Sequence, residues 1–255
     1  MKYRPILFST EMVKAILDGS KTQTRRLIKP QPKYPEMELK HFIGKWAYFE
    51  TPSGHHDPTM YHATKKAEVG DIFWIREPVK ILSHKKHDPN NFYSYKYDYE
   101  YISDGEVKRE QVIPERITRN HINQLIYENF EGTWLTKHNR VPNGCLKEMA
   151  RTFLKCINVR VERLQEISEQ DAKAEGVKTN ECGNIEGCVA CQVKCKCEGE
   201  YWDYMDQSGE TFPKYSAKES FFSLWESING RESLESNPWV WVFEFSLTEK
   251  PELWP

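Results

Sequence analysis

Apolar residues recur at helical spacing in three short stretches of the chain, and each stretch predicts a helix. The first runs from Ser9 to Asp18, the second begins at Ser168 and the third begins at Ser216. Each starts at a serine that can cap a helix, and each is followed by a glycine, the residue favoured just beyond a helix end. Three short helices are therefore expected.

Alternating or densely apolar stretches predict the strands. Thr22 to Ile28 is polar and β-branched and ends before Pro30, while the apolar run after Gly70-Asp71 ends before Pro78. Three further strands are expected over residues 92–101, 152–164 and 239–245. On the first strand the two-residue period places Thr22 and Thr24 on one face and Gln23 and Arg25 on the other.

Short strands with a few short helices indicate an α+β fold built on a small β-barrel. No repeat or low-complexity linker divides the chain, so residues 1–255 are expected to form a single domain. Its core blocks are expected at about 1–32, 67–82, 150–178 and 215–248, with insertions at about 33–66, 83–149 and 178–214.

The composition indicates which class of protein to expect. Hydrophobic residues make up 38% of the chain and charged residues 29%, as in ordinary soluble proteins, and no apolar run is long enough to span a bilayer. The first residues lack the apolar stretch of a signal peptide, so a cytoplasmic protein is expected, with cysteines that are thiols or metal ligands.

The charge is unevenly distributed although the net charge is only −2. Residues 1–33 hold eight basic side chains and two acidic ones, a local charge of +6. This pattern indicates either an anionic partner such as nucleic acid or a solvated basic face.

Five of the seven cysteines lie close together: Cys182, Cys188, Cys191, Cys195 and Cys197. Closely spaced thiolates on a loop with glycines can surround Zn²⁺ tetrahedrally, so we expect a structural zinc site formed by the last four, with Cys182 as an alternative ligand. Free thiols, or a redox or iron–sulfur site, are the alternatives. No organic cofactor is expected, and Cys145 and Cys156 are expected to be packing residues.

The stretch from Gly19 to Arg26 is the candidate for chemistry. A lysine whose pKa is lowered by burial can activate a nearby threonine hydroxyl if a carboxyl group elsewhere donates a proton. Lys21 and Thr24 supply the first two groups, and Glu175, at the end of its short predicted helix, is a candidate for the third. The spacing alone also fits an ordinary turn that takes no part in chemistry.

Four blocks of the chain, about 90 residues in all, resemble the ASCH domain family, which shares the PUA-like barrel. They are residues 4–9 through 19–26, residues 70–77, residues 161–168 through 175–177, and residues 237–245. The first and last blocks especially resemble ASCH proteins encoded by phages and prophages, so the resemblance is compatible with a phage-encoded protein acting in a bacterial cytoplasm.

The resemblance implies a cleft that is lined by the motif G-x-K-T-x-T-x-R and faces RNA or a modified nucleoside. In the small bacterial ASCH enzyme that hydrolyses N4-acetylcytidine, the matching residues imply Lys21 as proton acceptor, Thr24 as nucleophile and Glu175 as proton donor. This chain is more than twice as long as that enzyme. It has Arg25 in place of an aliphatic residue and adds the cysteine loop after Glu175.

Three functions follow as alternatives: an amidohydrolase of N4-acylcytidine type, a non-catalytic module that binds RNA or modified bases, and a ribonuclease. In the binding module, cations would contact phosphates and aromatic rings would stack on bases. The residues expected to bind substrate or nucleic acid are Thr22, Arg25, Arg26, Trp74, Arg76 and Glu77.

Overall fold

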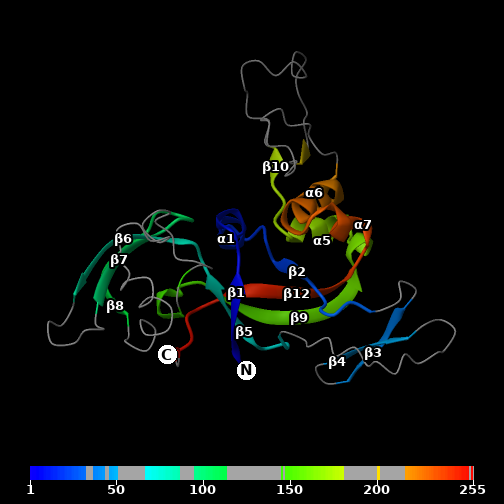
Figure 1. Cartoon of the computed structure of the whole chain (residues 1–255), viewed down its shortest axis with the longest axis horizontal. Coiled ribbons are helices and arrows are strands. Elements are labelled where there is room, and N and C mark those ends of the chain that lie inside the picture. The colour runs from blue at the N-terminus through cyan, green and yellow to red at the C-terminus, as the bar shows by residue number, and fades with distance from the viewer. Residues whose placement is uncertain are drawn as a thin grey trace, which may run out of the picture. The chain divides into compact units, whose positions relative to one another are not determined.

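The structure is a computed structural model of the 255-residue chain (Figure 1). It describes residues 1–32, 37–43, 46–50, 67–86, 95–113, 145, 147–180, 200–201, 216–252 and 254. The chain divides into two compact units. The first contains Met1–Asp18, Asp71–Lys155 and Leu247–Pro255, and the second contains Gly19–Gly70 and Cys156–Ser246.

The first unit is built mainly from strands. Its elements are β1 (Tyr3–Leu7), α1 (Thr10–Leu17), β5 (Ile72–Arg76), β6 (Val79–Lys86), β7 (Tyr95–Tyr101), β8 (Val107–Ile113), the 3-10 helix η2 (Lys147–Met149) and the start of β9 (Phe153–Arg163). Strand β1 pairs in parallel with β5, and β5 pairs antiparallel with the start of β9. Strands β6, β7 and β8 form a separate antiparallel sheet.

The second unit carries the remaining elements. They are β2 (Gln23–Leu27), β3 (Glu38–Ile43), β4 (Trp46–Glu50), the rest of β9, η3 (Leu164–Glu166), α5 (Glu169–Ala174), β10 (Thr179–Asn180), β11 (Glu200–Tyr201), α6 (Ala217–Asn229), α7 (Arg231–Glu235) and most of β12 (Trp239–Thr248). Here the strand order is β9-β12-β2, and β12 runs antiparallel to β2. Strands β3 and β4 form one antiparallel pair and β10 and β11 another.

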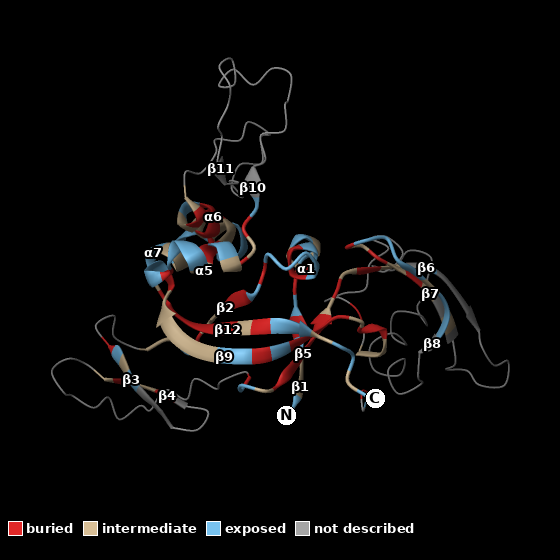
Figure 2. Ribbon diagram, turned by 180° about the vertical axis from the view of Figure 1, so that it is seen from behind, coloured by how far each residue is buried: buried red, intermediate tan, exposed pale blue. Residues whose placement is uncertain are grey.

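The core of the second unit lies where α5 and α6 pack on β12. Figure 1 shows α5, α6 and α7 gathered on one side of β2, β9 and β12, and Figure 2 shows the buried stretch of β12 beneath them. Val240 and Val242 of β12 are fully buried against Phe221 and Trp225 of α6. Each of these large apolar side chains contributes about 1.5–3 kcal/mol by leaving water, so this contact fixes α6 on the strand.

The three helices begin where the sequence predicts. Ser9, Ser168 and Ser216 are the N-caps, and each side-chain oxygen accepts a hydrogen bond from a backbone N–H three residues on. Two apolar residues of the predicted helical stretches do not face the core, since Leu17 is 44% and Ile228 58% exposed at the last turns of their helices. The short helix α7 was not predicted, and neither were the strands β1, β3, β4, β6, β8, β10 and β11.

The predicted α+β class is confirmed. Within the described residues the strands do not close into a barrel, since the pairings leave β1 and β2 as end strands. Cys145 and Cys156 are fully buried, as predicted for packing residues. None of the described helices is long and apolar enough to cross a membrane.

Candidate functional site

Backbone contacts fix Lys21 between the end of α5 and β12. Lys21 forms an isolated antiparallel bridge with Glu175, the C-cap of α5. The Thr22 N–H donates to the carbonyl of Ala174 at 2.8 Å, and the Phe245 N–H donates to the carbonyl of Thr22 at 2.9 Å. Lys21, which follows the predicted turn, is therefore held beside Glu175, which lies far along the chain.

Lys21 and Glu175 form a buried pair. The Lys21 ammonium lies 2.8 Å from Glu175 Oε2 and 2.7 Å from the Glu175 carbonyl oxygen. Cations commonly occupy this position, where the last carbonyls of a helix lack helical partners. The two side chains are only 0% and 5% exposed. Burial lowers the pKa of Lys21, although the Glu175 charge opposes this shift.

Arg25 contacts the same carboxylate from the adjacent strand β2. Its Nη1 lies 2.9 Å from Glu175 Oε1, so both oxygens of Glu175 accept from cations. Its Nε and Nη2 lie 2.8 and 2.6 Å from Glu162 Oε1 on β9. The Arg25 guanidinium also lies 5.6 Å from the centre of the Phe221 ring. Arg25 thus connects α5 and β9 through one planar group.

Arg160 of β9 extends this network outward. Its Nε lies 3.1 Å from Glu162 Oε2, one Nη lies 3.1 Å from Asp171 Oδ2, and the other pairs with Glu244 of β12. Gln23 Nε2 donates to Asp171 Oδ1 at 2.6 Å. Burial alone would raise the pKa of Asp171, but hydrogen bonds from Gln23 and Ser168, with the charges of Arg160 and Arg25, outweigh burial and lower it.

We call these seven ionisable residues the charged cluster: Lys21, Arg25, Arg160, Glu162, Asp171, Glu175 and Glu244. Side-chain exposure rises from 0% at Lys21 and Arg25 to 29% at Arg160. The charged cluster therefore extends from a buried pair to the protein surface.

The structure brings two of the three predicted catalytic residues together. Lys21 and Glu175 are in direct contact, and Thr24 is buried on β2 at 3% exposure. Gln23 and Arg25 both face the charged cluster, and the alternation along the strand places Thr24 on the opposite face. Among the described contacts, none joins Thr24 to Lys21 or Glu175.

Thr22 and Arg26 differ in their surroundings. Thr22 is exposed, whereas Arg26 is half-buried. Burial lowers the pKa of Arg26, and the charge of Glu175 acts against this shift. The carboxylate of Glu175 therefore influences Lys21, Arg25 and Arg26 together.

The other three predicted binding residues belong to the first unit. Trp74 packs in its core, with its ring centre 5.8 Å from that of Trp254, and Arg76 Nε lies 3.5 Å from the Cys145 carbonyl. Glu77 is completely buried, and its carboxylate accepts hydrogen bonds from Ser103 Oγ at 3.0 Å, Arg151 Nη2 at 2.9 Å and Thr152 Oγ1 at 2.6 Å. These contacts describe a satisfied structural carboxylate.

The five clustered cysteines, Cys182, Cys188, Cys191, Cys195 and Cys197, lie outside the described residues. The chain on either side is described: Thr179 pairs with Tyr201 and Asn180 with Glu200. The two ends of this segment therefore lie side by side. In the part of the chain that the structure describes, no group of three or more His, Cys, Asp or Glu side chains is arranged to hold a metal ion.

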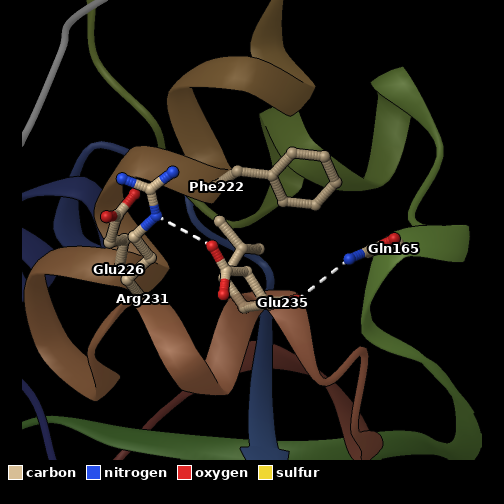
Figure 3. Close-up of a pocket in the computed structure, with 6 residues that line it drawn as sticks. Gln165, Phe222, Glu226, Arg231 and Glu235 are labelled. Carbon is tan, nitrogen blue, oxygen red and sulfur yellow. Dashed lines mark hydrogen bonds and ion pairs between the residues drawn. The ribbon is translucent and has the colours of Figure 1, made fainter.

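A separate hollow lies on the second unit between η3 and the helices α6 and α7 (Figure 3). It has a volume of about 440 Å³ and is lined by Gln165, Phe222, Glu226, Arg231, Leu234 and Glu235. Arg231 pairs with Glu235 at 2.8 Å across one wall. The lining contains none of the predicted site residues, and its one described ion pair is exposed, so we place the candidate site at the charged cluster.

Comparison of the chain with protein-family models, curated proteins and solved structures gave no match. The site is therefore described from its own residues.

Sequence reasoning missed most of the outer residues of the charged cluster, namely Gln23 beside it and Arg160, Glu162, Asp171 and Glu244 within it. One signal was present in the sequence. Arg160 and Glu162 alternate with Val159 and Val161 on a strand, and Glu244 interrupts the apolar run of β12. Charged residues in core strands are expected to have oppositely charged partners, because an unpaired buried charge is costly.

Proposed function

We propose that the second unit carries an ASCH-type site that hydrolyses the amide of an N4-acylated cytosine, in a modified nucleoside or in RNA. The observation that supports this proposal is the buried contact of 2.8 Å between Lys21 Nζ and Glu175 Oε2. The membership of the ASCH family, and with it a PUA-like arrangement, is part of the proposal and rests on the motif residues.

The proposed reaction uses three side chains. Thr24 Oγ1 attacks the acyl carbonyl carbon while Lys21, in its neutral form, takes the hydroxyl proton. The new C–O bond forms an acyl ester on Thr24, the C–N bond breaks, and Glu175 gives a proton to the departing cytosine amine. Water then hydrolyses the ester, which releases the acyl group as its carboxylic acid and restores the threonine hydroxyl, and the proton held by Lys21 returns to Glu175.

The lowered pKa of Lys21 is consistent with its role as proton acceptor, because burial favours the uncharged amine. A neutral lysine beside a protonated glutamic acid carries the same number of protons as the ion pair. The two forms differ only by one proton moved along the hydrogen bond between Lys21 and Glu175.

A panel of N4-acylcytidines, as free nucleosides and within an oligoribonucleotide, tests this proposal. The absorbance of the cytosine base measures the release of its free amine. We expect this release for at least one acyl group. Lack of turnover of every member of the panel by folded protein would contradict hydrolysis.

A second candidate, a non-catalytic module that binds RNA or modified bases, is favoured by two details of the same site. Both oxygens of Glu175 already accept from cations, and Thr24 lies on the strand face opposite Arg25. This candidate predicts binding that weakens with added salt and survives Thr24→Val, which keeps the shape of the side chain but removes its hydroxyl. Hydrolysis predicts that Thr24→Val abolishes turnover.

A further inference from the structure

The hollow between η3 and the helices α6 and α7 places apolar surface beside a carboxylate (Figure 3). Phe222 of α6 and Leu234 of α7 are partly buried against the core of the second unit and also line the hollow. Glu226 follows Phe222 by four residues on α6, so the ring and the carboxylate lie one turn apart on the same face of the helix. A ligand that packs on the ring of Phe222 can therefore reach the carboxylate of Glu226.

The charged groups of the hollow are unbalanced. Its lining holds two carboxylates, Glu226 and Glu235, and one guanidinium, Arg231. Arg231 pairs with Glu235 at 2.8 Å, whereas no hydrogen bond or ion pair joins Glu226 to another residue in the described part of the chain. Beyond the lining, α6 and α7 carry four glutamates and two cationic residues in all. The hollow thus offers a carboxylate within an acidic surface, which attracts cations.

Hydrogen bonds hold the walls of the hollow in place without a ligand. On η3, Gln165 Nε2 donates to the Leu234 carbonyl at 2.9 Å, and the Gln165 N–H donates to Asn237 Oδ1 at 2.9 Å. Between the two helices, Trp225 Nε1 donates to Ser233 Oγ at 3.2 Å. A site whose walls are already fixed loses little conformational entropy when it binds a ligand.

The size of the hollow suits a small ligand better than a protein partner. Its volume of about 440 Å³ lies within the range of about 300–1,000 Å³ that is usual for small-molecule sites. Six residues line it, far fewer than the roughly 20–30 residues that each side of a stable protein–protein interface contributes. We therefore expect an occupant of small-molecule size.

We propose that this hollow binds a small organic cation, namely an amine or guanidine carried on an apolar body. The cationic group pairs with Glu226, and the apolar body packs on Phe222 and Leu234. An anion would instead be repelled by Glu226, because Arg231 already has Glu235 as its partner. No residue of the charged cluster takes part, so this site can exist whether or not the second unit hydrolyses acylcytidines.

The probe that tests the site is 4-phenylbutylamine, which joins an aromatic ring to an ammonium that is charged at pH 7. It is titrated into the ¹⁵N-labelled full chain, and the backbone amide shifts locate its binding. We expect shifts to change at η3, α6 and α7, and we expect the neutral analogue 4-phenylbutan-1-ol to bind about 3–10-fold more weakly. The anionic analogue 4-phenylbutyrate is expected to bind more weakly still.

Three variants separate the contribution of the charge from that of the apolar surface. Glu226→Gln, at a partly exposed position, is expected to weaken binding of the amine by about 3–10-fold and to remove its advantage over the alcohol. Phe222→Ala is expected to weaken binding of both. Glu232→Gln, which removes an exposed carboxylate of α7 outside the lining, is the matched control and should leave both affinities unchanged.

Three results would overturn the proposal. The first is an absence of shift changes at η3, α6 and α7 with about 5 mM amine, roughly the weakest affinity expected for a ligand of this size. The second is equal affinity for the amine and the alcohol. The third is undiminished binding of the amine by folded Glu226→Gln.

Discussion

The ammonium of Lys21 lies 2.8 Å from the carboxylate of Glu175, although 154 residues separate them in the chain. The contact depends on β2 lying beside β12 and on the end of α5 meeting the chain at Thr22. A lysine and a glutamate that are both buried are costly unless they pair. The second unit therefore maintains a contact whose geometry suits proton transfer.

Glu175→Gln is expected to destabilise the protein strongly. The substitution leaves Lys21 and Arg25 buried without the carboxylate that both contact, and breaking a buried ion pair typically costs about 3–5 kcal/mol. Urea denaturation measures the change. Glu232→Gln, at an exposed position of α7, is the matched control and should change the free energy of unfolding by less than about 0.5 kcal/mol. A loss below about 1 kcal/mol for Glu175→Gln would contradict the expected cost of leaving Lys21 and Arg25 buried without this carboxylate.

Asp171→Asn is expected to destabilise the protein in a pH-dependent way. The folded-state pKa of Asp171 is lowered, so its ionised form stabilises the native state at pH values above its unfolded pKa. That contribution is lost as the pH falls through the folded pKa. The difference in unfolding free energy between wild type and Asp171→Asn should therefore be largest near pH 7 and shrink below about pH 4. A difference that does not change with pH would contradict the assigned contacts.

Glu77→Gln separates a structural role from a binding role. Glu77 is fully buried and accepts from Arg151, Thr152 and Ser103, so the neutral amide should cost about 3 kcal/mol of stability. Substrate affinity should not change. Thermal unfolding and a binding titration measure the two effects, with exposed Glu252→Gln as control. Weaker binding at unchanged stability would instead support the binding role predicted from the sequence.

The cysteine segment is predicted to bind one structural zinc ion. Asn180 and Glu200 pair at its two ends, as is expected of a segment that returns on itself. Metal analysis of purified protein should give about one equivalent of zinc, released by a chelator together with a loss of stability. Less than about half an equivalent would contradict the site. Cys188→Ser should remove the metal if this residue is a ligand, whereas buried Cys156→Ser should leave it bound.

Local signals in the sequence predicted part of the fold. Serine caps and following glycines located the helices, and the dense apolar run of β12 identified the central strand. Strands β3, β6 and β8 were missed because their side chains mix apolar and charged types without a clear two-residue period, and sheet pairing rather than local preference decides such segments.

The sequence predicted only two residues at the centre of the candidate site. The motif around Lys21 indicated the lysine, and the helix that ends at Glu175 indicated the glutamate. The role of Arg25 was not visible, because an arginine on a strand can face an external anion or a carboxylate of its own chain. Its contacts with Glu162 and Glu175 depend on the order of β2, β12 and β9, which a sequence pattern does not specify.

The most direct measurement compares hydrolysis of N4-acetylcytidine by the wild-type protein and by Lys21→Met. Lys14→Met, at an exposed lysine of α1, is the matched control, and circular dichroism confirms that each variant is folded. If Lys21 accepts the proton of the nucleophile, its loss should lower kcat by about 10²–10⁴-fold while Lys14→Met keeps the wild-type rate. Undiminished turnover by folded Lys21→Met would contradict the proposal that the Lys21–Glu175 pair carries out the reaction.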